Sequence, residues 1–306
     1  MADDAAEAGL VDIHTHVQPS ASAGRTFLGR LFLDDHPLVG TVDELLAVMD
    51  EAAISRTVIV PWLPAHDLVD EAVAAGTDRD QAVDDVVSSW RELNRWATEA
   101  VQAHPGRLRC LVGLDPILMS EEVMAEEVDE RLAAGAGGLK VAPMFLGIRP
   151  DDPAMEVVWR LARQHDVYVL SECGALPYTH HGAWGHPDGF DEVLRSYPDV
   201  DVLLAHLGQG AEDRVARLTE RHGNVFTDTS LRLGAPEQGG WSPEDTVEVI
   251  RRIGVDRVLF GTNYPIVDPR AYAATLRSLP LDEDELDLIG RRNAERLLDR
   301  RSVPSV

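Results

Sequence analysis

The chain has 306 residues, and its 28 basic and 53 acidic residues give a formal net charge of −25. That charge, spread over many segments, indicates a solvated acidic surface and argues against nucleic acid and membranes as partners. The two cysteines lie in apolar runs without CxxC spacing, which argues against a disulfide framework and a thiolate zinc site. Because the sequence also shows no signal-peptide or membrane-spanning pattern, we expect a cytoplasmic protein.

Eight short apolar runs rich in β-branched residues predict β-strands. They cover residues 10–14, 55–62, 107–116, 136–143, 167–174, 200–208, 224–231 and 256–265. Helical patterns lie between them, with start signals at Thr41 (a capping box with Glu44), at Asp152 before Pro153, and at Ser242 before Pro243. Eight strands alternating with helices predict a parallel (β/α)8 TIM-like barrel, formed by residues 1–306 as one domain. A last helical pattern, residues 282–300, is expected to seal its outside.

Three connections after predicted strands are unusually long: residues 17–40, 63–80 and 175–190. In a barrel of this kind, the loops that follow the strands build the active face. These connections and the one after the seventh strand carry large apolar side chains: Phe27, Leu28, Phe32, Trp62, Leu63, Tyr178, Trp184, Phe190 and Trp241. Such residues either bury one another or line a pocket for an apolar small-molecule substrate, and the sequence leaves both open.

Polar residues stand at the ends of five predicted strands. The first strand ends in His14 and His16, whose spacing of two places both side chains on one side of the strand and favours metal binding. The fourth, fifth, sixth and eighth strands end with Lys140, Glu172, His206 and Asn263. Each has a structural alternative, such as a backbone hydrogen bond or a turn, but five of eight ends are hard to assign to chance.

Lys140 is the only lysine in the chain, because the other 27 basic residues are arginine. An exposed cation contributes little through its identity, so a surface role does not explain the choice. Lysine can lose its proton, attack an electrophile or be carboxylated, whereas the guanidinium group does none of these. The residue type therefore indicates a chemical role for Lys140.

These motifs, in this order, resemble the amidohydrolase superfamily and its decarboxylase-like second amidohydrolase branch. The resemblance rests on "HTH" after the first strand, the lysine after the fourth, "AHLG", "FGTNYP" and the closing "GRRNAERLL", and it covers residues 10–298. It implies a barrel with one or two divalent metal ions that activate water. Two positions depart from the pattern: Glu172 replaces a usual histidine, and Asn263 replaces the aspartate that usually takes the proton from water. Together the two changes leave the charge of the site unchanged.

The resemblance implies two arrangements of the metal site. In the first, His14 and His16 hold one ion, Glu172 and His206 hold a second, and a carboxylated Lys140 bridges them, with the Asn263 oxygen as a weak ligand. In the second, one ion is bound and Lys140 remains an ammonium group near an anionic substrate. The donor set suits zinc or iron(II), with manganese as a further candidate.

Further residues are expected to serve the chemistry. Glu172 is the base that remains when the aspartate is lost, and His206, His180 or His181 could protonate a leaving group. Asp228, at the end of the seventh strand, is expected to orient a histidine or a water molecule, and Arg232 to meet a carboxylate or phosphate.

Three functions remain open. The first expectation is a metal-dependent hydrolase of an ester, thioester, lactone or amide in an apolar molecule. A thioester is favoured, because a thiolate leaves without much protonation, and the altered ligands also resemble those of a diiron thioester hydrolase of terpenoid antibiotic biosynthesis. The alternatives are non-oxidative decarboxylation of an aromatic or unsaturated acid, and a catalytically silent barrel that binds an apolar ligand or partner. The sequence leaves the oligomeric state open, with a homodimer as one option.

Overall fold

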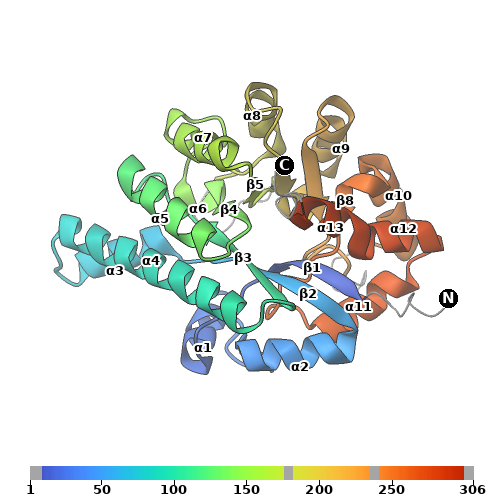
Figure 1. The fold of residues 1–306 in the computed structure, drawn as a ribbon, viewed down its shortest axis with the longest axis horizontal. Helices are drawn as coiled ribbons and strands as arrows, with labels where there is room; N and C mark the ends of the chain where they lie inside the picture. The colour runs from blue at the N-terminus through green and yellow to red at the C-terminus, as the bar shows by residue number, and fades with distance from the viewer. Residues whose placement is uncertain (1–8, 176–181, 235–240, 300–306) are drawn as a thin grey trace.

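The computed structural model describes residues 9–175, 182–234 and 241–299. Eight parallel strands pair in the order β1 to β8, and helices surround them, which confirms the predicted (β/α)8 barrel (Figure 1). The strands are β1 (Leu10–Thr15), β2 (Ile54–Ile59), β3 (Leu108–Gly113), β4 (Gly138–Val141), β5 (Tyr168–Ser171), β6 (Val202–Leu204), β7 (Val225–Asp228) and β8 (Val258–Leu259). Strands β2 to β8 each end before the last residue of the apolar run predicted for them. Glu172, His206 and Asn263 follow the ends of β5, β6 and β8, whereas Lys140 still lies within β4.

The helices lie outside the strands (Figure 1). They are α1 (Ala21–Arg30), α2 (Val42–Ala52), α3 (Ala65–Ala74), α4 (Arg79–Ala103), α5 (Glu121–Ala133), α6 (Pro143–Leu146), α7 (Glu156–His165), α8 (Phe190–Ser196), α9 (Glu212–Arg221), α10 (Pro243–Ile253), α11 (Pro269–Ser278), α12 (Glu283–Asp287) and α13 (Asn293–Leu298). The closing helical pattern predicted for residues 282–300 comprises α12, a π-helical turn and α13. The long connections after β1 and β2 contain α1 and α3.

The predicted helix starts are confirmed at Thr41, Asp152 and Ser242, whose side chains accept hydrogen bonds from the backbone of the following turn. The capping box of Thr41 is only half formed. The Glu44 carboxylate accepts hydrogen bonds from the backbone N–H groups of Val39 and Gly40 at 2.8 Å. It also accepts one from the Tyr264 hydroxyl at 2.6 Å. Glu44 therefore ties the start of α2 to the loop after β8.

The barrel closes through that same loop. The backbone N–H of Ile13 donates to the carbonyl of Phe260 at 2.9 Å, and that of Asn263 donates to the carbonyl of His14 at 2.9 Å. The N–H of His16 donates to the carbonyl of Tyr264 at 2.6 Å. The loop after β8 thus runs alongside β1 and brings His14 and Asn263 together.

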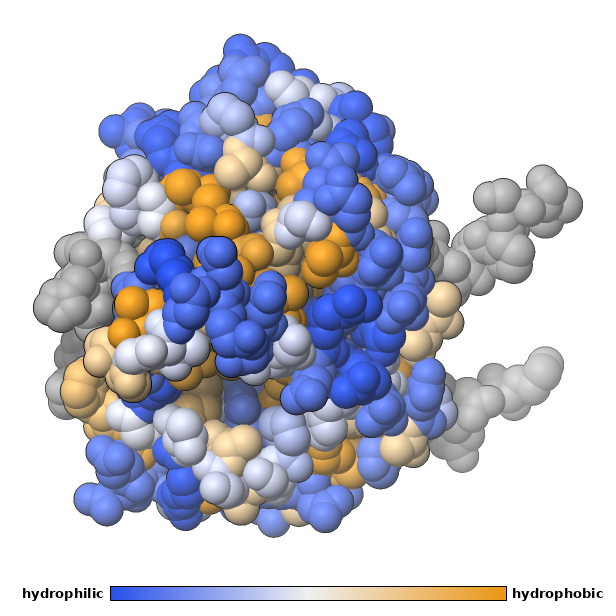
Figure 2. All heavy atoms as spheres, turned by 90° about the vertical axis from the view of Figure 1, so that its left-hand side faces the viewer, coloured by the Kyte–Doolittle hydropathy of each residue, from blue (hydrophilic) through white to orange (hydrophobic). Residues whose placement is uncertain are grey.

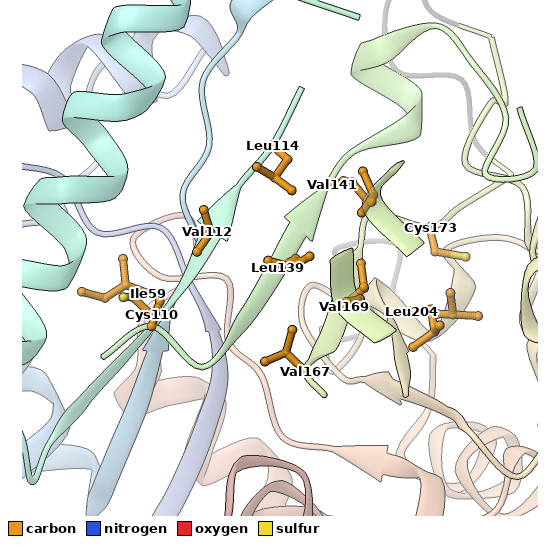
Figure 3. Close-up of a cluster of buried hydrophobic side chains, with 14 of the residues drawn as sticks. Ile59, Cys110, Val112, Leu114, Leu139, Val141, Val167, Val169, Cys173 and Leu204 are labelled. Carbon is orange, nitrogen blue, oxygen red and sulfur yellow. The ribbon is translucent and has the colours of Figure 1, made fainter. Parts of the chain in front are cut away.

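The apolar core has two layers, because successive strand residues point to opposite faces. Leu111 belongs to the cluster inside the barrel, whereas its neighbours Cys110 and Val112 face the surrounding helices. Figure 3 shows part of the outer layer, with Cys110, Val112, Leu139, Val169 and Leu204 packed between strands and helices. Cys110 and Cys173 are both buried, and neither forms a disulfide in this structure.

The surface agrees with the acidic composition. On the face that Figure 2 shows, hydrophilic residues predominate and hydrophobic residues form small patches among them. Phe32, at the end of α1, is the most exposed large apolar side chain in the described part of the chain, at 83%. No helix within the described ranges combines the length and apolar character needed to cross a bilayer.

Candidate active site

A cavity lies at the carboxyl ends of the strands, and the centre of a water molecule can occupy about 110 Å³ of it. We call it the strand-end cavity. All six strand-end residues predicted from the sequence line it: His14, His16, Lys140, Glu172, His206 and Asn263. The structure therefore brings together side chains from the first, middle and last parts of the sequence. His180 and His181 lie outside the described residues.

Three imidazole rings form the centre of this group. The ring centroid of His14 lies 5.0 Å from that of His16 and 5.2 Å from that of His206. Burial lowers the pKa of His16 and lowers that of His206 to about 3, so both rings are neutral. Neutral imidazoles are the form in which histidine binds metal ions.

Each ring is held through its Nδ1 atom. His14 Nδ1 lies 3.0 Å from Asp228 Oδ2, and His16 Nδ1 lies 2.9 Å from the carbonyl oxygen of Val60. His206 Nδ1 contacts Ser230 Oγ at 2.7 Å. This arrangement leaves each Nε2 available, and His14 Nε2 is buried without a partner among the described atoms. Holding one ring nitrogen to orient the other is the usual arrangement of metal-ligating histidines.

Asp228 supports two of the three histidines. Besides contacting His14, its Oδ1 accepts hydrogen bonds from the backbone N–H groups of His206 at 3.1 Å and Ser230 at 3.0 Å. Burial opposes ionisation of Asp228, but the nearby His14 and the hydrogen bonds lower its pKa. His14, His206 and Asp228 offer atoms within 4.8 Å of one another, so this group could also hold an ion. Because both Asp228 oxygens already have partners, we assign it an orienting role.

Lys140 and Glu172 form a second polar group of the cavity. Lys140 is 4% exposed, and burial lowers its pKa to about 8, against the opposing effect of Glu172. Burial likewise raises the pKa of Glu172 to about 7, against the effect of Lys140. Gly185 packs against the carboxyl group, since a β-carbon at this position would lie 2.6 Å from Glu172 Oε2. The cavity therefore contains a carboxyl group that can hold a proton near neutral pH.

Asn263 lies in the loop after β8, which runs alongside β1; we call this junction the seam. The Asn263 backbone is left-handed (φ 70°), a conformation that asparagine tolerates better than most residues. Its Oδ1 is buried and, like both oxygens of Glu172 and Nε2 of His14, has no hydrogen-bond partner among the described residues. Buried polar atoms without partners are uncommon and indicate a missing ligand or water. This set of nitrogen and oxygen donors fits a divalent cation such as manganese, zinc or iron(II).

Asp12 is a supporting residue that was not among the candidates predicted from the sequence. It is 1% exposed, and it accepts hydrogen bonds from His14 N at 3.1 Å and Thr262 N at 3.0 Å. The Thr262 hydroxyl donates to its other oxygen at 2.6 Å. Asp12 thereby fixes the residues on both sides of the seam. A signal was present, because a carboxylate in an apolar strand two residues before His14 must point the same way as the histidine.

Other predicted contacts differ from expectation. Arg232 does not line the cavity. Its guanidinium pairs with Glu212 at 2.8 Å and stacks on Trp241 at 4.3 Å, so its contacts in the structure are with protein groups, and its contact with a ligand's carboxylate or phosphate stays a prediction. Of the large apolar loop residues, Phe27 and Trp62 line the cavity, and Leu28 and Phe190 belong to the core.

Comparison with known proteins identifies the fold and the family. Residues 11–300 match the family model described as amidohydrolase. A γ-resorcylate decarboxylase from Polaromonas sp. strain JS666 is 24% identical over 119 residues, which are 34% of this chain and 36% of the relative. The alignment thus spans about a third of that relative's length.

Solved structures with the same fold include three decarboxylases. A 2,6-dihydroxybenzoate decarboxylase complexed with 2,6-dihydroxybenzoate superposes with a TM-score of 0.71 at 17% identity, covering 95% of this chain and 99% of the other. A 5-carboxyvanillate decarboxylase from Sphingomonas paucimobilis gives 0.70 at 17% identity, with 95% and 99% covered. A dihydroxybenzoic acid decarboxylase from Polaromonas sp. JS666 with bound manganese gives 0.68 at 18%, with 95% and 97% covered.

These comparisons correct the first functional expectation. The relative and the three structures above are all decarboxylases, so the expected hydrolase of an ester, thioester, lactone or amide is overturned in favour of the decarboxylase alternative. The expected zinc or iron also finds no support in the neighbours, three of which carry manganese. The barrel, its strand-end residues and the match over residues 11–300 lead to one conclusion: the chain belongs to the amidohydrolase family, and the decarboxylases above share its fold.

Proposed function

We propose that the protein is a metal-dependent, non-oxidative decarboxylase of an aromatic or unsaturated carboxylic acid. One observation carries the proposal: the strand-end cavity combines neutral imidazoles and an ammonium group with a protonatable carboxyl group, Glu172, while Asn263 stands where a base would be needed for hydrolysis. Hydrolysis requires a group that takes a proton from water, and the Asn263 amide has no such basicity. Decarboxylation requires instead a group that gives a proton to carbon.

The metal site follows from the orientation of the rings. Nε2 atoms of His14, His16 and His206 would hold one divalent ion, with Oδ1 of Asn263 facing the same cavity. We infer manganese, since three similar solved structures carry it. When bound, the ion would neutralise charge on the substrate's carboxylate and on a neighbouring oxygen. The alternative, a carboxylated Lys140 that bridges two ions, uses the same residues and predicts two ions per chain.

The remaining steps depend on the chain's own groups. The ammonium group of Lys140 attracts the substrate's carboxylate into the cavity and orients it. As the bond between the ring carbon and the carboxyl carbon breaks, carbon dioxide leaves and the electron pair stays on the ring carbon. Glu172 then donates its proton to that carbon, so that R–COO⁻ and H⁺ become R–H and CO₂. Solvent returns the proton to Glu172 after each cycle.

Carbon dioxide release tests the proposal. Manganese-loaded protein should release carbon dioxide from at least one acid of a panel that includes 2,6-dihydroxybenzoate and 5-carboxyvanillate. Glu172→Gln should keep its manganese and bind the acid but lose turnover by about 10²–10⁴-fold, because the amide cannot donate the proton as an acid does. Elemental analysis should find one ion per chain. Carbon dioxide release at the wild-type rate by Glu172→Gln would contradict the assigned proton donor.

A further inference from the structure

The strand-end cavity has two chemically different ends. Its floor holds the polar strand-end residues, whereas a second set of residues from five different loops forms its upper wall. This apolar wall consists of Phe27, Leu31, Trp62, Met144, Phe145, Leu231 and Ile266. Within the described part of the chain, Gln209 is the one further residue that lines the cavity, and it is uncharged. A ligand that reaches the floor with its carboxylate must therefore place the rest of its body against hydrocarbon.

Three aromatic rings of the wall are packed into a fixed series. The ring centroids of Phe27 and Trp62 lie 5.3 Å apart at an interplanar angle of 78°, and those of Trp62 and Phe145 lie 5.6 Å apart at 78°. Both pairs have the edge-to-face geometry that aromatic rings favour. Phe27 also lies 5.7 Å from the ring of His16, so the series begins at the polar floor. Because the rings support one another, this part of the wall is formed before a ligand binds.

The cations nearest to this wall in the sequence are already paired with protein groups. Arg30, next to Leu31, forms two hydrogen bonds with the Glu71 carboxylate at 3.0 and 2.8 Å. Arg232, next to Leu231, pairs with Glu212. Among the described residues that line the cavity, the apolar wall contributes no charged side chain. A second carboxylate or a phosphate on the ligand would lose its hydration there without gaining a partner.

From these observations we infer the substrate class: a monocarboxylic arene whose distal substituents, on the side away from the carboxylate, are hydrocarbon, with no second acidic group at the far end. The inference rests on the proposed function, because it assigns the polar floor to the carboxylate. It assigns Trp62 and Phe145 as the residues that determine specificity for the distal substituent. Each methylene added at the far end should then increase affinity about fourfold, the value for moving one CH₂ group out of water.

Calorimetric binding to the manganese-loaded protein tests this without requiring turnover. Benzoates with methyl, ethyl, propyl and butyl groups at the 4-position should bind with dissociation constants that fall about fourfold per carbon until the wall is filled. Terephthalate, which has a second carboxylate at that position, should bind on the order of 100-fold more weakly than 4-methylbenzoate. The inference would be overturned by dissociation constants that do not change with the length of the alkyl group, by no binding of any alkylbenzoate, or by preferred binding of terephthalate.

Amino-acid substitutions test whether the gain in affinity per methylene arises at the apolar wall. Phe145→Ala should reduce the gain per methylene, whereas Phe32→Ala should leave it unchanged, because Phe32 is exposed and does not line the cavity. Leu31→Arg should narrow or reverse the preference for 4-methylbenzoate over terephthalate by supplying a cation. An equal effect of the Phe145 and Phe32 substitutions would refute the assignment. Carbon dioxide release is measured separately: the predicted binding series without carbon dioxide release from any acid of the panel would reject the proposed function and leave only the binding preference of the apolar wall.

Discussion

The position of Glu172 can be tested through a glycine that does not itself carry chemistry. A methyl group added at Gly185 would lie 2.6 Å from Glu172 Oε2 and 3.4 Å from its carboxyl carbon. Since non-bonded heavy atoms pack best at about 3.5–4.0 Å, the carboxyl group must move by roughly 1 Å. A displacement of that size at a reacting group lowers turnover by about 10²-fold, which corresponds to about 2.7 kcal/mol in the activation barrier.

We therefore expect Gly185→Ala to lower kcat for decarboxylation by about 100-fold while the protein stays folded, since such overpacking costs about 1–3 kcal/mol of stability. The control is Gly223→Ala, because a β-carbon there meets nothing within 4 Å and should leave kcat unchanged. Manganese content should stay at the wild-type value in both variants.

A second substitution distinguishes displacement of Glu172 from general damage. In Gly185→Ala, the further change Glu172→Asp shortens the side chain by one methylene and should recover part of the lost turnover, although Glu172→Asp alone lowers it. Recovery in the double variant would show that the two residues are coupled. The reasoning from this contact would be refuted if Gly185→Ala retained kcat within threefold of wild type. It would also be refuted if Glu172→Asp lowered kcat in the Gly185→Ala variant by the same factor as in the wild-type protein.

The remaining predictions concern the supporting residues. Asp228→Asn removes the charge that orients His14 at 3.0 Å and should weaken manganese affinity by about 10–100-fold, measured by competition with a chelator; unchanged affinity would contradict its orienting role. Neither cysteine should react with a thiol reagent at pH 8 in the folded protein, because both are buried and burial raises the pKa of Cys110 to about 12, whereas two thiols should react in denaturant. Tyr264→Phe removes the 2.6 Å hydrogen bond to Glu44 and should lower the free energy of unfolding by about 1–3 kcal/mol, measured by urea denaturation. An unchanged free energy of unfolding would contradict the contribution assigned to this hydrogen bond.

The sequence predicts the barrel well because its strands are apolar on both faces. The runs "SRTVIVPW" and "VYVLSECG" contain the unbroken apolar stretches "VIV" and "VYVL", and such stretches reflect burial of the strand on both faces. Their carboxyl ends are harder to predict. His206, Leu207 and Gln209 all have a positive φ, which side-chain type does not announce for histidine, leucine or glutamine. Of these three residues, His206 and Gln209 line the strand-end cavity.

Residue types alone do not predict whether the site hydrolyses or decarboxylates its substrate. Glu172 and Lys140 would serve either a hydrolase or a decarboxylase, since the same carboxyl group can take a proton from water or give one to carbon. Which of these it does depends on how far burial raises its pKa, and burial is a property of the assembled cavity. Asp12 was missed for a related reason, because its partners in Thr262 are 250 positions away.

The seam between β1 and the loop after β8 has a consequence for assembly. The hydrogen bonds that close the barrel join His14 and His16 to Asn263 and Tyr264, so the first and last parts of the chain must meet before the cation pocket is complete. A partly folded molecule with open ends would have neither the pocket nor the affinity that comes with it. A manganese ion that binds only the closed barrel should therefore stabilise it by mass action, and it should not stabilise molecules in which β1 and the loop after β8 are still apart.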